Sequence, residues 1–463
     1  MNIRVLKKSA LYLIGNFSSK LLMAIIIPIY AFYVQSSDLG YFDYSQTIMF
    51  IVVPIVFFSI WEAILKFTID DNYPKSEIIN SAVLLSIGAC LIIAAGIFVF
   101  SLFVDVRYLL YILLMFVIYG LVQIWQYAAR GVNDSGIYVI SGIVGTVVNF
   151  GAIFLFVVCL RLGLQGLLIS YILSQISTFI TIEIKLHLLA NVRMRRSSFK
   201  LLKRMVLFSA PLTLNTISAW LFTGFSRVII NGRLGAYENG LYAFANKFSI
   251  VISMLGSVIT MAVIEEAIIS RNQNKTGTSE GKNTGELYIA LICIAMVATP
   301  AIKIFYDFIS QSEYYSSFIY VPFLLLYAAL ITLASNIGAQ FQALDVTKYQ
   351  FLTTIISSIV TVALSIFFIG SYGVFAVIIA QVVGAFVMVV TRYIVVKKRM
   401  YYKMNLIKML LVSVIYIIVS LLCFKASLGI ALTLFVVSLG VSVLFNYSVF
   451  LSLLKGRTTR NHS

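Results

Sequence analysis

Long apolar runs recur along the whole of this 463-residue sequence, and they constrain the fold more than any other feature. An α-helix needs about 20 predominantly apolar residues to cross a bilayer. With 61% hydrophobic and only 11% charged residues, the chain has too few charged side chains to build a water-facing surface. We therefore expect an all-α integral membrane protein. About fourteen spans are predicted, at roughly 10–34, 43–66, 78–104, 108–129, 136–160, 165–186, 205–230, 241–266, 286–309, 318–342, 350–369, 373–396, 406–424 and 428–454.

Lys and Arg residues gather in alternate connections, which predicts the orientation of the spans. Two connections on one side, and the two chain ends, are basic. This places both termini in the cytoplasm and explains the net charge of +17 as a topology signal facing anionic lipid, not as a nucleic-acid footprint. The basic residues of these two connections are Lys185, Arg193, Arg195, Arg196, Lys200, Lys203 and Arg204, and Arg392, Lys397, Lys398, Arg399, Lys403 and Lys408.

An internal duplication relates the two halves of the chain. "DLGYFDYSQ" (38–46) corresponds to "ENGLYAFAN" (238–246), with Gly40 matching Gly240, and two weaker pairs follow in the same order. Because each repeat holds six spans, the halves are expected to run parallel, with a substrate site between them. The predicted division is an N-lobe at 1–186, a basic linker at 187–204, a C-lobe at 205–396, and two further spans with a basic tail at 397–463.

Several polar and cationic side chains fall inside predicted spans. Lys20, in "GNFSSKLLMAIIIPIY", lies near the middle of the first span, where an ammonium is costly and therefore indicates a wet or paired environment. Arg227, Lys247 and Arg130 are the other candidate anion-binding cations. Interfacial anchoring is an equal alternative for Arg130 and Lys247. Candidate cavity-lining residues are Asn16, Gln123, Gln126, Thr216, Trp220, Asn246, Asn336 and Gln340.

Acidic residues are scarce in the spans. Glu62 with Lys66, and Asp307 with Lys303, have the i,i+4 spacing of local ion pairs on one helix. Both pairs are expected near span ends, and no acid is expected as deep as Lys20, so the predicted cavity carries net positive charge and suits an anion such as phosphate. Four scattered cysteines and two histidines predict neither a disulfide framework nor a metal site.

The motifs "SSDLGYFDYSQT" and "GRLGAYENGLYAFANKF", on two six-helix repeats plus two terminal spans, resemble the multidrug/oligosaccharidyl-lipid/polysaccharide exporter superfamily. Within it, the chain most resembles the Wzx-type polysaccharide repeat-unit flippases of bacteria. The resemblance implies two lobes around a cavity that opens alternately to each side of the membrane.

What the resemblance implies about function is the translocation of undecaprenyl-diphosphate-linked oligosaccharide across the bacterial plasma membrane, for surface polysaccharide synthesis. Lys20, Arg227 and Lys247 would then contact the diphosphate or acidic sugars. An ion gradient would supply energy without a cofactor, and glycan polymerase machinery is a further implied partner. By analogy with peptidoglycan-precursor flippases, residues 406–454 would form a groove for the lipid tail.

Four alternatives stay open beside this interpretation. A multidrug or organic-cation exporter of the same fold would require a buried carboxylate, and none is predicted at the midplane. A peptidoglycan-precursor flippase is less well excluded. A polymerase or ligase, which would be an enzyme, is disfavoured because the outer connections are short and carry no catalytic motif, and a channel is disfavoured by the duplication.

Overall fold

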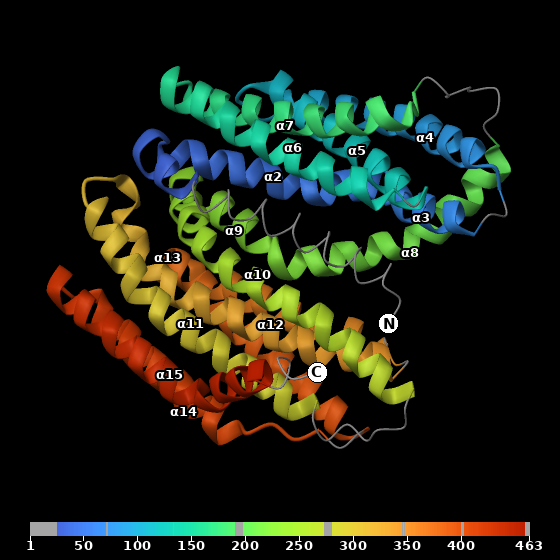
Figure 1. Cartoon of the computed structure of the whole chain (residues 1–463). Coiled ribbons are helices and arrows are strands. Elements are labelled where there is room, and N and C mark those ends of the chain that lie inside the picture. The colour runs from blue at the N-terminus through green and yellow to red at the C-terminus, as the bar shows by residue number, and fades with distance from the viewer. Residues whose placement is uncertain are drawn as a thin grey trace. The chain divides into compact units, whose positions relative to one another are not determined.

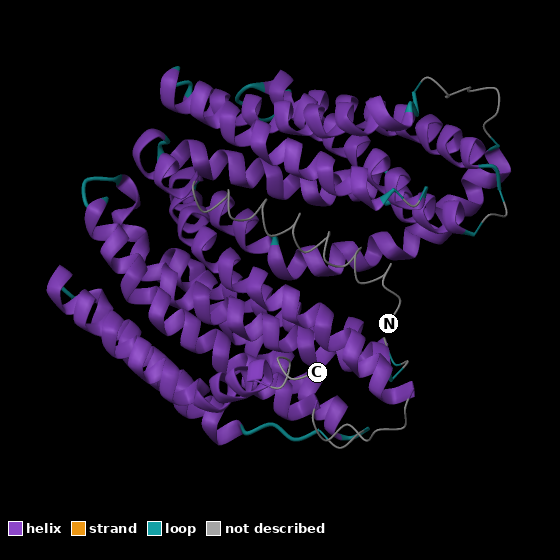
Figure 2. Ribbon diagram, viewed as in Figure 1, coloured by secondary structure: helices purple, strands orange, loops and turns teal. Residues whose placement is uncertain are grey.

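In the computed structural model, residues 26–70, 73–132, 134–189, 198–272, 280–344, 346, 348–399 and 402–458 are described. Throughout these ranges the regular structure is helical, without any strand (Figure 2). Eleven of the described helices are long and apolar enough to cross a membrane. Because lipid cannot satisfy backbone polar groups, helices that bond all of them internally are what such apolar runs must form. The predicted all-α, multi-pass membrane fold is confirmed.

The chain divides into two compact units, Met1–Gly240 and Leu241–Ser463 (Figure 1). The boundary lies in α10 (Ala236–Asn272). The lobe boundaries expected at the 187–204 connection stay a prediction. The helices of the first unit are α2 (Ser36–Val56), α3 (Ile60–Ile69), α4 (Lys75–Ser101), α5 (Leu109–Gly131), α6 (Ser135–Ile153), the π-helix η1 (Phe154–Cys159), α7 (Gly163–Leu186), α8 (Phe199–Thr223) and α9 (Phe225–Leu234).

The second unit contains the remainder of α10 and the helices that follow it. These are α11 (Glu280–Phe308), the 3-10 helix η3 (Glu313–Tyr320), α12 (Val321–Ala343), α13 (Lys348–Lys397), α14 (Leu406–Phe424) and α15 (Leu428–Thr458). Its core is aromatic at one end, where Phe244 stacks on Tyr314 with ring centroids 4.3 Å apart. Polar caps begin several helices of the chain, as when Asn405 accepts a hydrogen bond from the Lys408 backbone N–H at the start of α14.

The 50-residue α13 supplies two of the expected spans. Its backbone leaves the helical region at Gly373, which has a φ of 57° that glycine adopts without steric cost. Arg392 donates hydrogen bonds to Thr353 and Thr354, 39 and 38 residues earlier in the same element. In a straight helix those residues would lie about 57 Å apart. The element therefore reverses at Gly373, and its two arms pack side by side.

The second predicted span is interrupted between α2 and α3. Phe58 and Ser59 both have positive φ, 51° and 45°, which is rare for residues other than glycine. Pro54 lies just before the interruption and cannot donate a backbone hydrogen bond. Ser59 is buried and accepts a hydrogen bond from the Thr213 hydroxyl of α8 at 3.1 Å. The interruption is thus fixed by a tertiary contact.

Candidate functional site

Arg227, one of the predicted cations, forms an ion pair with Asp43. Arg227 lies in α9 and its Nε is 2.8 Å from Asp43 Oδ2 of α2, with each side chain 19% exposed. Arg227 also donates a hydrogen bond to the Thr223 carbonyl oxygen at 3.1 Å. The sequence analysis did not predict this carboxylate beside Arg227, and the net positive charge of the cavity stays a prediction. An arginine inside a membrane helix is costly, and a carboxylate partner offsets much of that cost.

Asp43 lies on a face of α2 that is bonded at every turn to the chain around α9. Ser36, Gly40, Asp43 and Thr47 recur at spacings of four, three and four residues, so they share one side of the helix. The Ser36 hydroxyl donates to the Tyr237 carbonyl oxygen at 2.8 Å. The polar contacts of this face, which we call the α2 seam, are completed by Asn239 Nδ2 to the Gly40 carbonyl oxygen at 2.7 Å and Trp220 Nε1 to the Thr47 carbonyl oxygen at 2.8 Å.

The α2 seam brings the duplicated glycines into contact. A Cβ atom on Gly40 would overlap the Ala236 carbonyl oxygen, and one on Gly240 would overlap the Ser36 carbonyl oxygen. The two overlaps are reciprocal, because Gly240 lies 200 residues after Gly40 and Ala236 lies 200 residues after Ser36. Small residues four apart on two helices permit such close backbone approach in membranes. The duplication read from sequence thus places its matched residues at one helix crossing.

A second polar cluster in the first unit contains Arg130, the candidate cation on α5. The Arg130 guanidinium lies over the Tyr127 ring at 4.7 Å and the Tyr138 ring at 5.6 Å. The Tyr127 hydroxyl donates to Glu62 Oε1 at 2.9 Å, while Lys66 lies over the Phe208 ring at 4.2 Å. The predicted Glu62–Lys66 pair is therefore wrong. Tertiary partners from α5 and α8 replace the local one.

The remaining first-unit candidates differ in their surroundings. Gln123 and Gln126 are half-buried on α5. Thr216 on α8 donates to the Leu212 carbonyl oxygen at 3.2 Å, a bond within its own helix. Of the candidate lining residues in this unit, Trp220 contacts the α2 seam directly. Lys20 and Asn16 lie outside the described residues, so their assignment stays a prediction.

Candidates in the second unit fall on α10 and α12. Lys247 and Asn246 are half-buried on α10, where Asn246 Oδ1 accepts a hydrogen bond from Ser249 at 2.6 Å. Asn336 and Gln340 are buried on α12, and Asn336 Nδ2 donates to the Thr332 carbonyl oxygen at 2.9 Å. These bonds within single helices favour packing roles over exposed ligand contacts for Asn336 and Asn246. The predicted local pair of Lys303 with Asp307 on α11 is confirmed.

Arg392, which the sequence placed in a basic cytoplasmic connection, lies inside α13 and is 5% exposed. Its Nη1 donates to the Ala334 carbonyl oxygen at 2.7 Å. Its Nε and Nη2 donate to Thr353 Oγ1 and Thr354 Oγ1 at 3.2 and 3.0 Å. The basic cluster that follows it in the sequence concealed this burial, because charge counting over a connection does not separate helix from loop.

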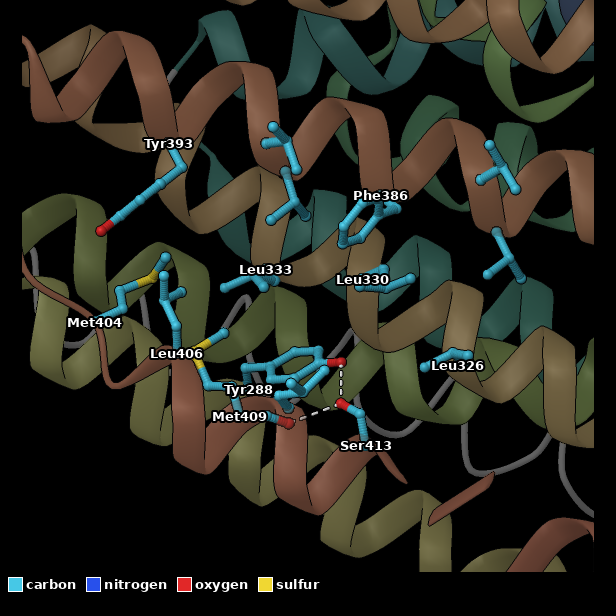
Figure 3. A pocket seen from close by; sticks show the side chains of 15 residues that line it. Tyr288, Leu326, Leu330, Leu333, Phe386, Tyr393, Met404, Leu406, Met409 and Ser413 are labelled. Carbon is cyan, nitrogen blue, oxygen red and sulfur yellow. Dashed lines mark hydrogen bonds between the residues drawn. The ribbon is translucent and has the colours of Figure 1, made fainter. Parts of the chain in front are cut away.

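An apolar groove of about 640 Å³ opens in the second unit between α11, α12, the second arm of α13 and α14 (Figure 3). Its walls are mostly aliphatic. Tyr288 Oη and Ser413 Oγ are 2.8 Å apart, and Ser413 also donates to the Met409 carbonyl oxygen at 2.9 Å, so these polar atoms bind each other (Figure 3). The groove suits a hydrocarbon chain. Of the predicted 406–454 region, the described residues that line it belong to α14.

Asp43 is the residue that sequence reasoning missed. It was assigned to the start of a span, and its helix in fact begins earlier, at Ser36. The available signal was its place in the duplicated motif "DLGYFDYSQ", where the second copy has Ala243 in place of the acid. Within the described residues, no group of three or more His, Cys, Asp and Glu side chains could hold a metal ion.

Three solved structures share this fold. The lipid II flippase MurJ in an inward closed conformation superposes with a TM-score of 0.73 at 16% identity, covering 95% of this chain and 99% of that one. A multidrug resistance MATE family transporter of the MOP superfamily matches in an inward-facing conformation, with TM-score 0.65, 14% identity and coverages of 83% and 98%. An outward-facing structure of a MATE family transporter matches with a TM-score of 0.57 at 16% identity, covering 85% of this chain and 95% of that one.

The sequence comparisons identify the family. No curated protein sequence matches the chain. The family described as "Polysaccharide biosynthesis protein" matches residues 5–264, more than half of the 463 residues. This match agrees with the polysaccharide-synthesis family that the sequence resembles, and the solved structures share the expected fold. The chain is a multi-pass membrane protein that belongs to the polysaccharide biosynthesis protein family.

Proposed function

We propose that this protein moves undecaprenyl-diphosphate-linked oligosaccharide units from the cytoplasmic to the outer leaflet of the bacterial plasma membrane by alternating access. The observation that carries the proposal is the match of a polysaccharide biosynthesis family to a chain with a transporter fold. The MurJ structure is named as a flippase of lipid II, also a lipid-linked substrate. The proposal makes the protein a transporter, not an enzyme, with an ion gradient as the energy source and no cofactor.

Two regions supply the chemistry that such an amphiphile requires. Arg227 is a largely buried guanidinium whose side chain keeps 19% of its surface exposed, and guanidinium groups bind phosphate oxygens in pairs. The apolar groove beside α14 supports a role for the isoprenoid chain. Lys20, Lys247 and Arg130 stay proposed as further contacts for the diphosphate or acidic sugars. A glycan polymerase is the proposed acceptor of the translocated unit.

Export of organic cations is the second candidate function. Half-buried Glu62 favours it, because the Tyr127 hydroxyl that donates a hydrogen bond to its Oε1 is neutral and does not compensate the carboxylate charge. Arg130 lies over the same tyrosine ring and contributes positive charge to the cluster. Asp43, the acid on the α2 seam, is paired with Arg227. The first unit therefore favours an anionic substrate over a cationic one.

The proposed function is tested by complementation of a flippase-deficient strain that makes the matching glycan. Wild type should restore surface polysaccharide, whereas Arg227→Ala should lose it and accumulate lipid-linked units inside the cell. Arg233→Ala, on the exposed last turn of the same helix, is the matched control at equal protein level. If wild type restores export of a cationic dye but no glycan in any tested strain, the exporter alternative replaces the proposal.

A further inference from the structure

We propose that Asp43 occupies Arg227 in the absence of substrate and competes with the substrate for it. The diphosphate of the substrate displaces Asp43 from Arg227, so that substrate binding loosens the α2 seam. The proposal rests on the proposed function and adds a residue, Asp43, and a sequence of events. It assigns Asp43 the role of a positioning residue, since it acts on substrate through the arginine.

The geometry of the pair is that of an exchangeable contact. Asp43 Oδ2 meets the guanidinium at its Nε edge, at 2.8 Å. Carboxylates and phosphates compete for the same guanidinium N–H donors, and both bind them most strongly through two parallel bonds. Both side chains keep 19% of their surface exposed. An anion can therefore approach the guanidinium without unfolding either helix.

Charge balance makes the carboxylate and the diphosphate alternatives. Without substrate, Arg227 needs a counter-ion because an isolated cation in a membrane helix is expensive. A diphosphate brings more charge and more acceptor oxygens than a single carboxylate, so it is the stronger partner. When it binds, Asp43 becomes an acid without its cation partner, next to bound anions, and is repelled.

The position of Asp43 connects this exchange to helix packing. Its neighbours on the same face, Gly40 and Thr47, accept hydrogen bonds from Asn239 and Trp220. The ion pair is the single charged contact among these seam contacts. A ligand shifts a conformational equilibrium only through its different affinity for the two states. Here the two states are one in which the α2 seam contacts are formed and Asp43 occupies Arg227, and one in which these contacts are loosened and Arg227 is open to the diphosphate.

The test measures binding of farnesyl diphosphate to the purified full-length protein. Asp43→Asn removes the competitor and should tighten binding about tenfold, a change that corresponds to roughly 1.4 kcal/mol. Arg227→Gln should weaken it by about as much. Asp38→Asn is the matched control and should leave the affinity unchanged. Asp38 lies on the same helix as Asp43, but its ion-pair partner, at 3.1 Å, is Arg107. Weaker binding by Asp43→Asn would overturn the proposal and make the pair structural.

Inorganic pyrophosphate and farnesyl monophosphate complete the ligand set. Tighter binding of pyrophosphate by Asp43→Asn would assign the competition to the diphosphate alone, and tightening confined to farnesyl diphosphate would add the lipid chain; both outcomes support the exchange. Equal tightening for the monophosphate would support the exchange as well, with charge and not the number of phosphate groups as its cause. No tightening for any of the three would overturn it.

Hydrogen exchange of the wild-type protein provides a readout that does not depend on a variant folding. Farnesyl diphosphate should speed exchange in peptides spanning 36–47, whereas a purely structural pair predicts slowed or unchanged exchange. Failure of glycan export with tightened diphosphate binding by Asp43→Asn would reject the proposed function and keep the competitor role. If the wild type exports glycan but Asp43→Asn binds farnesyl diphosphate more weakly, the proposed function is kept and the competitor role of Asp43 is rejected.

Discussion

Arg227 and Arg392 are both largely buried arginines in helices, one in each unit, and their surroundings differ. Arg227 is paired with a carboxylate at the Nε edge and is 19% exposed. Arg392 is 5% exposed and donates to three neutral oxygens on two helical elements. Gly338 makes room for it, since a Cβ there would lie 2.6 Å from Arg392 Nη1.

The difference indicates two uses of the same side chain. A guanidinium that is held by one carboxylate can exchange it for another anion. A guanidinium whose donors end on a backbone carbonyl oxygen of α12 and two hydroxyls of α13 ties three helical arms together, and nothing replaces those acceptors. We therefore assign Arg392 to stability and Arg227 to substrate exchange.

The largest expected effect follows from truncating the buried arginine. Arg392→Ala should destabilise the protein by about 3 kcal/mol, because it removes several charge-assisted hydrogen bonds and leaves a void between α12 and α13. Thermal unfolding in detergent measures this. Arg399→Ala, at an exposed arginine that donates to the Tyr349 hydroxyl, is the control. Equal losses of stability for the two variants would show that burial and the three hydrogen bonds of Arg392 do not make it more stabilising than an exposed arginine.

The next effect concerns the helix crossing beside Arg227. Gly40→Ala places a methyl group against the Ala236 carbonyl oxygen and should cost about 2 kcal/mol through overpacking. Gly88→Ala in α4, where a Cβ meets open space, should be nearly neutral. The same unfolding measurement compares them. If Gly40→Ala is also neutral, the α2 seam is looser than its contacts indicate.

The smallest expected effect comes from a partly exposed ion pair between the last turn of α7 and the residue before α6, which separates the influence of burial from that of pairing. Lys185 Nζ is 2.6 Å from Asp134 Oδ2, and its hydrogen bond holds the pKa of the Asp134 carboxyl below the usual value. A lowered folded-state pKa stabilises the fold above the unfolded-state value of about 3.9, and this contribution disappears as pH falls through the folded-state pKa.

Lys185→Met should therefore lower stability at pH 7 by only about 0.5 kcal/mol, as is typical of exposed pairs. The gap between Lys185→Met and wild type should close as the pH falls below about 4. Unfolding temperatures of the two proteins at several pH values measure this. A gap that persists at low pH would assign the effect to lost packing of the lysine stem.

Sequence reasoning succeeded where the signal was local or periodic. Apolar run lengths gave the all-α membrane fold, and the match of Gly40 with Gly240 identified residues that meet at one crossing. The Lys303–Asp307 pair was also predictable, because its partners are one helical turn apart.

Tertiary partners could not be predicted in this way. Asp43 and Arg227 are separated by 184 positions, and no helical period joins them. Polar residues at the start of α2 suggested a connection, yet Asp38 is satisfied there by the Leu164 backbone N–H and by Arg107. Arg392 was concealed by the basic residues after it. In each case the missing information was which other helix supplies the compensating group.

The central claim is most directly tested by flipping of undecaprenyl-diphosphate-linked oligosaccharide in proteoliposomes. Wild type should move the labelled substrate between leaflets much faster than empty liposomes, and Arg227→Gln should slow it about tenfold, the loss of one charge-assisted contact. Arg233→Gln should retain the wild-type rate. Wild-type vesicles that flip no faster than empty ones, with and without an imposed ion gradient, would contradict the account.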